Sequence, residues 1–214
     1  MTEPVLLSWS GGKDSAFLLH ELRTAGELEP AGLLTTFTED GRSGGHRVRR
    51  ELIERQAAEA GLPLHPILLP EAPSNAVYEA AMAEALRGLP IRRVAFGDIN
   101  LISIRDYRER QMAALGMEAV FPLWRRETPT FAREVLRLGF EATVVCVDTT
   151  RLEAAFAGRR YDEALLRDLP PEIDPCGENG ELHTFVHGGP IFRHAIEVRP
   201  GGRVDRGRFV FFDL

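Results

Sequence analysis

Short apolar runs alternate with amphipathic stretches along the first two thirds of the chain. The apolar runs are bounded by glycine, proline or charged residues, as is typical of buried strands in a parallel sheet. The stretch at 48–60 carries apolar residues on one side at helical spacing, and Gly61 ends it. The pattern predicts strands at 5–9, 33–37, 64–69, 94–96, 119–121 and 142–147. It predicts helices from about 15 to 22, and at 48–60, 74–86, 107–115 and 128–138.

Strands that alternate with helices of this length indicate an α/β fold with a parallel sheet flanked by helices. In such sheets ligands bind beyond the carboxyl ends of the strands, near the point where the strand order reverses. Residues 10–15, Thr35 with Thr36, and Gly97 with Asp98 all lie at the carboxyl ends of predicted strands. We therefore expect these segments to surround one crevice.

The pattern changes after about residue 151. A short helix is expected at 163–169, followed by a break at Pro170 and Pro171. Alternation at 192–198 and the apolar run at 209–212 predict antiparallel strands around a turn at 200–202. We expect two domains, 1–124 and a smaller α+β domain at 125–214. The sequence does not decide whether the strand at 142–147 joins the first sheet or belongs to the second domain.

Composition narrows the class of protein without naming a function. The chain has 214 residues, 44% hydrophobic and 27% charged, with a net charge of -6, so no global basic field favours nucleic acid or an anionic membrane. No apolar run approaches the ~18 residues of a membrane span. No signal peptide is evident, and Cys146 and Cys176 form no disulfide framework. A cytoplasmic protein is expected.

Residues 10–15, Ser-Gly-Gly-Lys-Asp-Ser, join the first strand to the first helix. Gly11 and Gly12 let backbone N–H groups approach an anion, and the helix N-terminus adds partial positive charge. Lys13 adds a full charge, and Asp14 or Ser15 is expected to cap the helix. These features favour a phosphate site, although neither the Walker A nor the dinucleotide pattern fits. The alternative is a tight turn without a ligand.

A second polar cluster lies in a glycine-flanked segment after the two prolines. It contains Glu178, Glu181 and His183, followed by Thr184. Two carboxylates and an imidazole are able to hold Mg²⁺, position an ammonium ion or move protons. The spacing is equally consistent with a solvated turn whose charges face water. Arg105 is a further candidate for a phosphate contact or for an ordinary solvated residue.

Residues 10–15 resemble the Ser-Gly-Gly-x-Asp-Ser signature of the PP-loop ATP pyrophosphatases. Over essentially the whole chain, the order of motifs is similar to the diphthine–ammonia ligase family, a branch with a Gly-Glu-x-Gly-Glu motif in its C-terminal domain. The matching segments are Gly97-Asp98-Ile99, Phe121-Pro122-Leu123-Trp124, Gly158-Arg159 and residues 176–184. Asn179 and His183 stand where archaeal and eukaryotic members are expected to have glycine and a carboxylate. Gly97-Asp98-Ile99 looks more like the bacterial-type relatives, so the acceptor substrate stays open.

The resemblance implies a Rossmann-like, adenine nucleotide alpha hydrolase-like fold and a two-step ligation. A substrate carboxylate would attack the α-phosphate of ATP, with Mg²⁺ on the phosphates, and ammonia would then displace AMP. The nucleotide would be bound by Ser10, Gly11, Gly12, Lys13, Asp14, Ser15, Thr35, Gly97 and Asp98. The catalytic residues would be Lys13, Asp14, Glu178, Glu181 and His183. The substrate would contact His46, Glu178, Glu181 and Thr184, although His46 is as readily a loop residue without a role.

The expected partners are ammonia and a carboxylate on a small molecule or a protein. Binding to a membrane or to nucleic acid is not expected. A homodimer is left open. One rival is a PP-loop enzyme of RNA modification or sulfur transfer, in which Cys176 would carry sulfur. Another rival is a non-catalytic sensor of adenine nucleotides. The residues that hold Mg²⁺ are left unassigned by the sequence.

Overall fold

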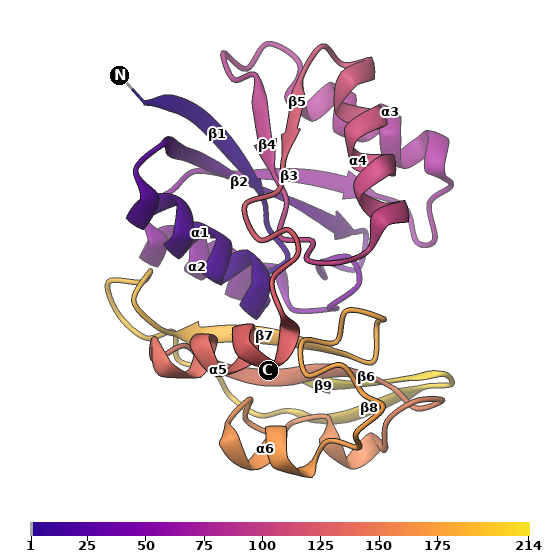
Figure 1. The fold of residues 1–214 in the computed structure, drawn as a ribbon. Helices are drawn as coiled ribbons and strands as arrows, with labels where there is room; N and C mark the ends of the chain where they lie inside the picture. Colours follow the sequence, from indigo (N-terminus) through magenta and orange to yellow (C-terminus); the bar gives the residue numbers. More distant parts are fainter. Residues whose placement is uncertain (1) are drawn as a thin grey trace.

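Two sheets organise residues 2–214, the part of the chain that the computed structural model describes (Figure 1). The first is a parallel sheet in the order β3-β2-β1-β4-β5, and the second is antiparallel in the order β7-β6-β9-β8. The strands are β1 Glu3–Ser8, β2 Leu28–Thr38, β3 Leu64–Leu69, β4 Arg93–Ala95, β5 Glu118–Val120, β6 Glu141–Asp148, β7 Leu182–Gly188, β8 Gly202–Arg206 and β9 Phe209–Asp213. The helices are α1 Lys13–Ala25, α2 Arg50–Ala60, α3 Asn75–Leu86, α4 Ile102–Ala114, α5 Thr128–Arg137 and α6 Glu163–Asp168, with a 3₁₀ turn at Ala154–Phe156.

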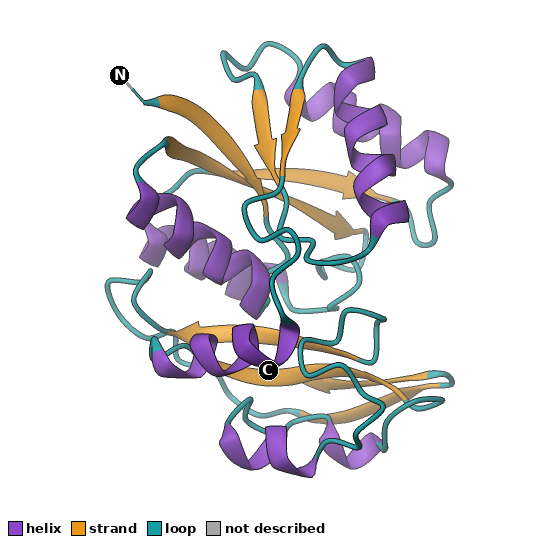
Figure 2. Cartoon of the chain, viewed as in Figure 1, coloured by secondary structure: helices purple, strands orange, loops and turns teal. Residues whose placement is uncertain are grey.

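The first sheet confirms the expected Rossmann-like α/β class. In Figure 2, helices cover both faces of the parallel sheet. Helices α1 and α2 lie on one face, and α3 and α4 lie on the other. Val5, Leu6 and Leu7 of β1 are fully buried because this central strand is covered on both sides. Within residues 2–214, no helix is both long and apolar enough to cross a membrane.

The strand order places a ligand crevice beside β1. This strand pairs in parallel with β2 on one side and β4 on the other, so the order reverses between them. The loop after β1 and the loop after β4 therefore leave the sheet side by side at its carboxyl edge. Gly97 lies so close to the start of α1 that a Cβ there would sit 3.3 Å from the Asp14 carbonyl carbon. The predicted meeting of these two loops is confirmed.

The two sheets join directly behind the glycine loop. The Val186 N–H of β7 donates to the Gly11 carbonyl oxygen at 2.9 Å, and Phe17 of α1 packs against Phe131 of α5 with ring centroids 4.6 Å apart. The strand predicted at 142–147 belongs to the second sheet, where β6 pairs with β7 and β9. The expected domain boundary at 124 stays a prediction.

The prediction of strands near the C-terminus was wrong in part. Residues 192–198 form no strand, because the segment crosses the end of α2, where the Arg193 N–H donates to the Glu59 carbonyl oxygen. The alternation there reflects buried Ile196 between exposed neighbours. The strands that flank the predicted return at 209–212 are β6 and β8. Strand β7, which begins at Leu182, was missed because the segment was interpreted as an irregular polar turn.

Three local predictions near the first sheet also needed correction. Helix α1 begins at Lys13 with Gly12 as its N-cap, so neither Asp14 nor Ser15 caps it. Helix α4 begins five residues earlier than its predicted start at 107. Strand β2 begins at Leu28, five residues before its predicted start at 33, and it continues to Thr38. Helix α3, predicted at 74–86, is capped by Ser74, whose side chain accepts a hydrogen bond from the Val77 N–H.

Candidate active site

The glycine loop is held in shape by hydrogen bonds among its own residues. The Gly12 N–H donates to Ser10 Oγ at 3.2 Å, and Ser15 Oγ donates to the Gly12 carbonyl oxygen at 3.0 Å. Gly11 has φ of +80°, and a Cβ there would lie 2.6 Å from Ile53 Cδ1. Only glycine adopts this backbone conformation at low cost in such a confined position. The loop is thus a fixed cradle at the start of α1.

Gln56 of α2 fixes this cradle from behind, and no motif in the sequence pointed to its role. Its side chain is fully buried, and Nε2 donates to the carbonyl oxygens of Gly11 at 3.0 Å and Val186 at 2.6 Å. Its Oε1 accepts from Trp9 Nε1 at 2.9 Å. One amide therefore ties the glycine loop, α2 and β7 together.

Gln56→Met is expected to lower the free energy of unfolding by about 2–4 kcal/mol, because it leaves the Trp9 N–H and a carbonyl buried without partners. Gln111→Met is the matched control, since both polar side-chain atoms of that buried glutamine make no hydrogen bond among the described residues. The control should change stability by less than about 0.5 kcal/mol or raise it. Chemical denaturation measures both, and equal losses would contradict the role of Gln56.

Lys13 lies buried where the two sheets meet, and it is the only lysine of the chain. Its Nζ lies 3.0 Å from both carboxylate oxygens of Asp14 and donates to the carbonyl oxygen of Cys176. Burial alone lowers the pKa of Lys13, but the carboxylates of Asp14 and Glu178 outweigh it and hold this pKa above its ordinary value. Lys13 is therefore a charged ammonium at neutral pH.

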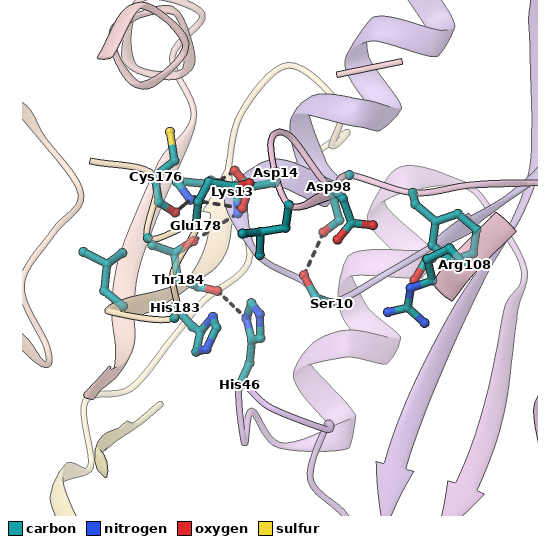
Figure 3. A pocket seen from close by; sticks show the side chains of 18 residues that line it. Ser10, Lys13, Asp14, His46, Asp98, Arg108, Cys176, Glu178, His183 and Thr184 are labelled. Carbon is teal, nitrogen blue, oxygen red and sulfur yellow. Dashed lines mark hydrogen bonds and ion pairs between the residues drawn. The ribbon is translucent and has the colours of Figure 1, made fainter. Parts of the chain in front are cut away.

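Glu178 faces Lys13 and Asp14 from the second half of the chain (Figure 3). Its Oε2 accepts from the N–H groups of Ile99 at 3.3 Å and Asn100 at 3.0 Å, so it bridges to the loop after β4. Burial, followed by the negative charge of Asp14, raises the pKa of Glu178 to about 7. This carboxyl group therefore gains and loses a proton near neutral pH.

The raised pKa of Glu178 predicts a pH-dependent stability. The protonated form is favoured in the fold, so this contribution is full below the ordinary pKa of 4.5 and is lost as pH rises through about 7. Glutamine resembles the protonated form at every pH. We expect Glu178→Gln to leave the melting temperature nearly unchanged at pH 5 and to raise it at pH 8. Thermal melting at both pH values tests this, and a rise confined to pH 5 would contradict it.

Glu181, the second predicted carboxylate, lies outside the cavity that Glu178 lines. It is fully buried, and its carboxylate accepts from Arg151 Nη2 at 3.2 Å and from the Asn179 N–H and side-chain amide at 3.0 Å each. The geometry assigns it to holding the turn at 177–181 in shape. That turn also requires Gly177, whose φ is +72° and where an added Cβ would clash with the Leu182 carbonyl oxygen. The substrate contact expected of Glu181 stays a prediction, which this buried position does not favour.

His46 and His183 stack on one another with ring centroids 4.6 Å apart and planes 29° apart. His46 Nδ1 lies 2.9 Å from the Thr184 carbonyl oxygen. Burial, together with the charge of Lys13, lowers the pKa of His46 to about 4. Burial and the neighbouring His46 lower the pKa of His183 to about 3. Both imidazoles are therefore neutral at pH 7. Thr184 itself is buried, and its Oγ1 accepts from the Lys13 N–H at 3.0 Å.

Two adjoining cavities open beside these residues. One, of about 250 Å³, is lined by the glycine loop, the loop after β4 and residues 176–184, including Gly97, Asp98 and Glu178. The other, of about 910 Å³, is lined by β2, the loop at 43–46, α3 and α4. Thr35 lines the larger cavity, but its hydroxyl donates to the Trp9 carbonyl oxygen at 2.8 Å. The lining of the smaller cavity brings two cations, Lys13 and Arg108, together with three carboxyl groups, Asp14, Asp98 and Glu178. The larger cavity has the volume of a small-molecule site.

Asp14 and Asp98 are the residues whose side chains suit a Mg²⁺ ion at this site. Asp14 Oδ1 is buried and makes no hydrogen bond within residues 2–214, although Lys13 Nζ is 3.0 Å away. Asp98 lines both cavities, and burial, followed by the charge of Asp14, raises its pKa despite the opposing effect of Arg108. No group of three acidic, histidine or cysteine side chains in the described chain converges as a metal site. The residues fit a Mg²⁺ ion held chiefly by phosphates and by one or two carboxylates.

Sequence reasoning also missed Arg108 and Tyr78, whose helices carry no distinctive motif. Arg108 lines both cavities, and its Nη1 donates to Tyr78 Oη at 2.8 Å. Arg105, the earlier phosphate candidate, instead pairs with Glu109 and lies over the rings of Phe121 and Trp124. The cation that faces the cavities on α4 is therefore Arg108.

Two comparisons with known proteins bear on this site. Residues 127–211 match a family model described as the diphthamide synthase C-terminal domain. Over 212 residues, the chain is 25% identical to the diphthine–ammonia ligase of Schizosaccharomyces pombe. That alignment covers 87% of this chain and 34% of the yeast protein, so the chain spans about a third of the length of this relative. Together the two findings support the diphthine–ammonia ligase family and confirm the resemblance in the sequence.

Proposed function

We propose that this protein is an ATP-dependent ligase that cleaves ATP to AMP and pyrophosphate, adenylates a carboxylate and converts it to an amide with ammonia. One observation carries the proposal: the glycine loop lies at the switch point of a parallel sheet, with Lys13 at its centre and Glu178 opposite. The N-terminus of α1 and the Lys13 ammonium together favour the charge of a leaving pyrophosphate. The yeast relative, named as a ligase acting with ammonia, supports the second half of the reaction.

The first step is assigned to the glycine loop. Residues 10–15 bind the β- and γ-phosphates while a substrate carboxylate oxygen attacks the α-phosphorus. The bond from the α-phosphorus to the bridging oxygen breaks, pyrophosphate leaves and an acyl-adenylate forms. Mg²⁺, when bound to the phosphates, supplies further positive charge for the leaving group. Lys13 is held at the loop by Asp14 and the Cys176 carbonyl oxygen, so its charge is in place before ATP arrives.

The second step is assigned to Glu178. Ammonia attacks the acyl carbon, AMP leaves with the electron pair of the broken C–O bond, and one proton must leave the nitrogen. Glu178 has a pKa of about 7 and lines the smaller cavity, so its carboxylate form is available as the acceptor of that proton. The position of the cavity between the two sheets shields part of it from water, which limits hydrolysis of the adenylate.

The partners of this reaction are proposed at the level of chemical class. They are ammonia and a carboxylate on a small molecule or a protein. Diphthine is one such carboxylate, and it comes to the proposal from the printed name of the yeast relative alone.

The single lysine gives a direct test of nucleotide binding. A sample labelled with ¹³C at the lysine ε-carbon is expected to give one ε-methylene NMR signal, that of Lys13. ATP with Mg²⁺ should shift this signal and pyrophosphate should shift it in the same direction, because both place phosphate at Lys13. Adenosine should leave it nearly unchanged. A signal that does not respond to saturating ATP would contradict the proposed phosphate site.

A further inference from the structure

The two cavities share a junction, and its lining contains one permanent cation. Six described residues line both cavities: Ser8, Ser10, His46, Asp98, Arg108 and His183. Of these six, Arg108 alone carries a full positive charge at neutral pH, because both histidines are neutral there. Figure 3 shows Asp98 between Arg108 and the pair formed by Lys13 and Asp14. Lys13 and Arg108 therefore stand on opposite sides of the junction.

The surroundings of the Arg108 side chain favour binding of an anion. Its guanidinium lies over the Phe96 ring at 5.0 Å from the centroid, and Nη1 is held by Tyr78 Oη at 2.8 Å. Its Nε is buried and donates to no described residue. Among residues 2–214, Arg108 forms no ion pair with a carboxylate, whereas Arg105 one turn earlier pairs with Glu109 at 2.7 Å. A buried donor on an oriented, unpaired guanidinium matches an oxyanion in geometry and charge.

The position of the junction identifies that oxyanion, on the basis of the proposed function. A nucleotide whose pyrophosphate lies in the glycine loop and whose nucleoside lies in the larger cavity passes the junction at its α-phosphate. We propose that Arg108 binds the α-phosphate of the nucleotide, opposite Lys13, which binds the leaving pyrophosphate. Arg108 then stabilises the negative charge on the α-phosphate oxygens when the carboxylate attacks.

Binding of AMP and adenosine separates this role from a structural one, because the two ligands differ only in the α-phosphate. In Arg108→Gln we expect the dissociation constant of AMP to rise about tenfold to a hundredfold, as for a lost charge-assisted hydrogen bond. The dissociation constant of adenosine should change by less than about twofold, which also shows that the variant is folded. Arg108→Lys should recover part of the preference for AMP. Arg105→Gln, on the same helix but outside both cavities, should behave as the wild type.

Equal losses for AMP and adenosine would overturn the proposal, since they would mean that Arg108 only shapes the nucleoside cavity. Unchanged binding of both ligands would overturn it as well. If Arg108→Gln fails to fold, the wild-type Arg108 Nε–H NMR signal, assigned by its loss in Arg108→Lys, decides the question. AMP must shift this signal and adenosine must not; any other response overturns the proposal. Wild-type protein that binds neither ATP nor AMP overturns the proposed function too. If the wild-type protein binds ATP but the outcomes above contradict the role of Arg108, only the assignment of Arg108 is wrong.

Discussion

Lys13→Met is expected to reduce pyrophosphate release from ATP by at least a hundredfold to a thousandfold. Methionine has a similar length but removes the one positively charged side chain within residues 10–15, so the leaving pyrophosphate loses its charge partner in the loop. The measurement is pyrophosphate release with ATP, Mg²⁺, ammonium and a metabolite extract as the source of acceptor. Retention of more than about a third of wild-type release would contradict the role of Lys13.

Folding of the variant must be checked, because Lys13 also bonds to Asp14 and the Cys176 carbonyl oxygen, and their loss lowers stability. Thermal melting shows whether the variant is folded at the assay temperature. Lys13→Arg is the companion variant. It retains the charge, but its larger guanidinium must fit a space that the buried Lys13 ammonium shares with the Tyr161 ring, 5.6 Å away. We expect Lys13→Arg to lie between Lys13→Met and the wild type.

Glu178→Gln is expected to reduce amide formation by about a hundredfold or more, while ATP binds within about threefold of wild-type affinity. The reason is that glutamine retains the shape of the side chain but cannot accept a proton from the attacking nitrogen. Amide product per AMP released is the measurement. The wild-type rate should also rise with pH through about 7, the pKa of Glu178, beyond the rise due to free ammonia, and the variant should lose this component.

Glu181→Gln is the matched control for Glu178→Gln. Its carboxylate is buried among Arg151 and Asn179 and does not line the cavity, so the substitution should lower stability with little change in turnover per folded molecule. Greater loss of amide formation in Glu181→Gln than in Glu178→Gln would reverse the assignment of the two carboxylates.

The glycine loop and its place in the fold were predictable because the signal is local. The apolar run of β1, two glycines and the start of α1 fix a strand, a turn and a helix N-terminus within twenty residues. The chain order of strands and helices then places the loop after β4 beside it, since parallel sheets with crossover helices have few topologies. The predicted meeting of Gly97 and Asp98 with residues 10–15 followed from this rule.

The parts that sequence reasoning missed depend on contacts across long distances in the chain. Gln56 and Gly11 are 45 residues apart, and Arg108 and Tyr78 are 30 apart, so no spacing rule connects them. Glu178 and Glu181 have the same chemistry three residues apart, yet only the fold shows that one faces the cavity and the other faces Arg151. Strand β7 was missed because its first residues carry polar groups that resemble a catalytic turn.

The burial of both cysteine thiols argues against the sulfur-transfer alternative. Cys176 Sγ donates to the Thr128 carbonyl oxygen at 3.3 Å, and burial raises the pKa of this thiol well above its ordinary value. Burial also raises the pKa of Cys146 to about 12. Thiols in this state are poor nucleophiles. Retention of labelled RNA on a filter would restore the RNA-modifying alternative.

The most direct test of the account is product analysis with α-labelled ATP. The protein is incubated with this nucleotide, Mg²⁺, ammonium and a fractionated metabolite extract, and AMP is separated from ADP. The account predicts AMP and pyrophosphate in equal amounts, dependent on one fraction of the extract and lost in Lys13→Met. Formation of ADP, or tight retention of ATP without turnover in any fraction, would contradict the ligase and favour a nucleotide sensor.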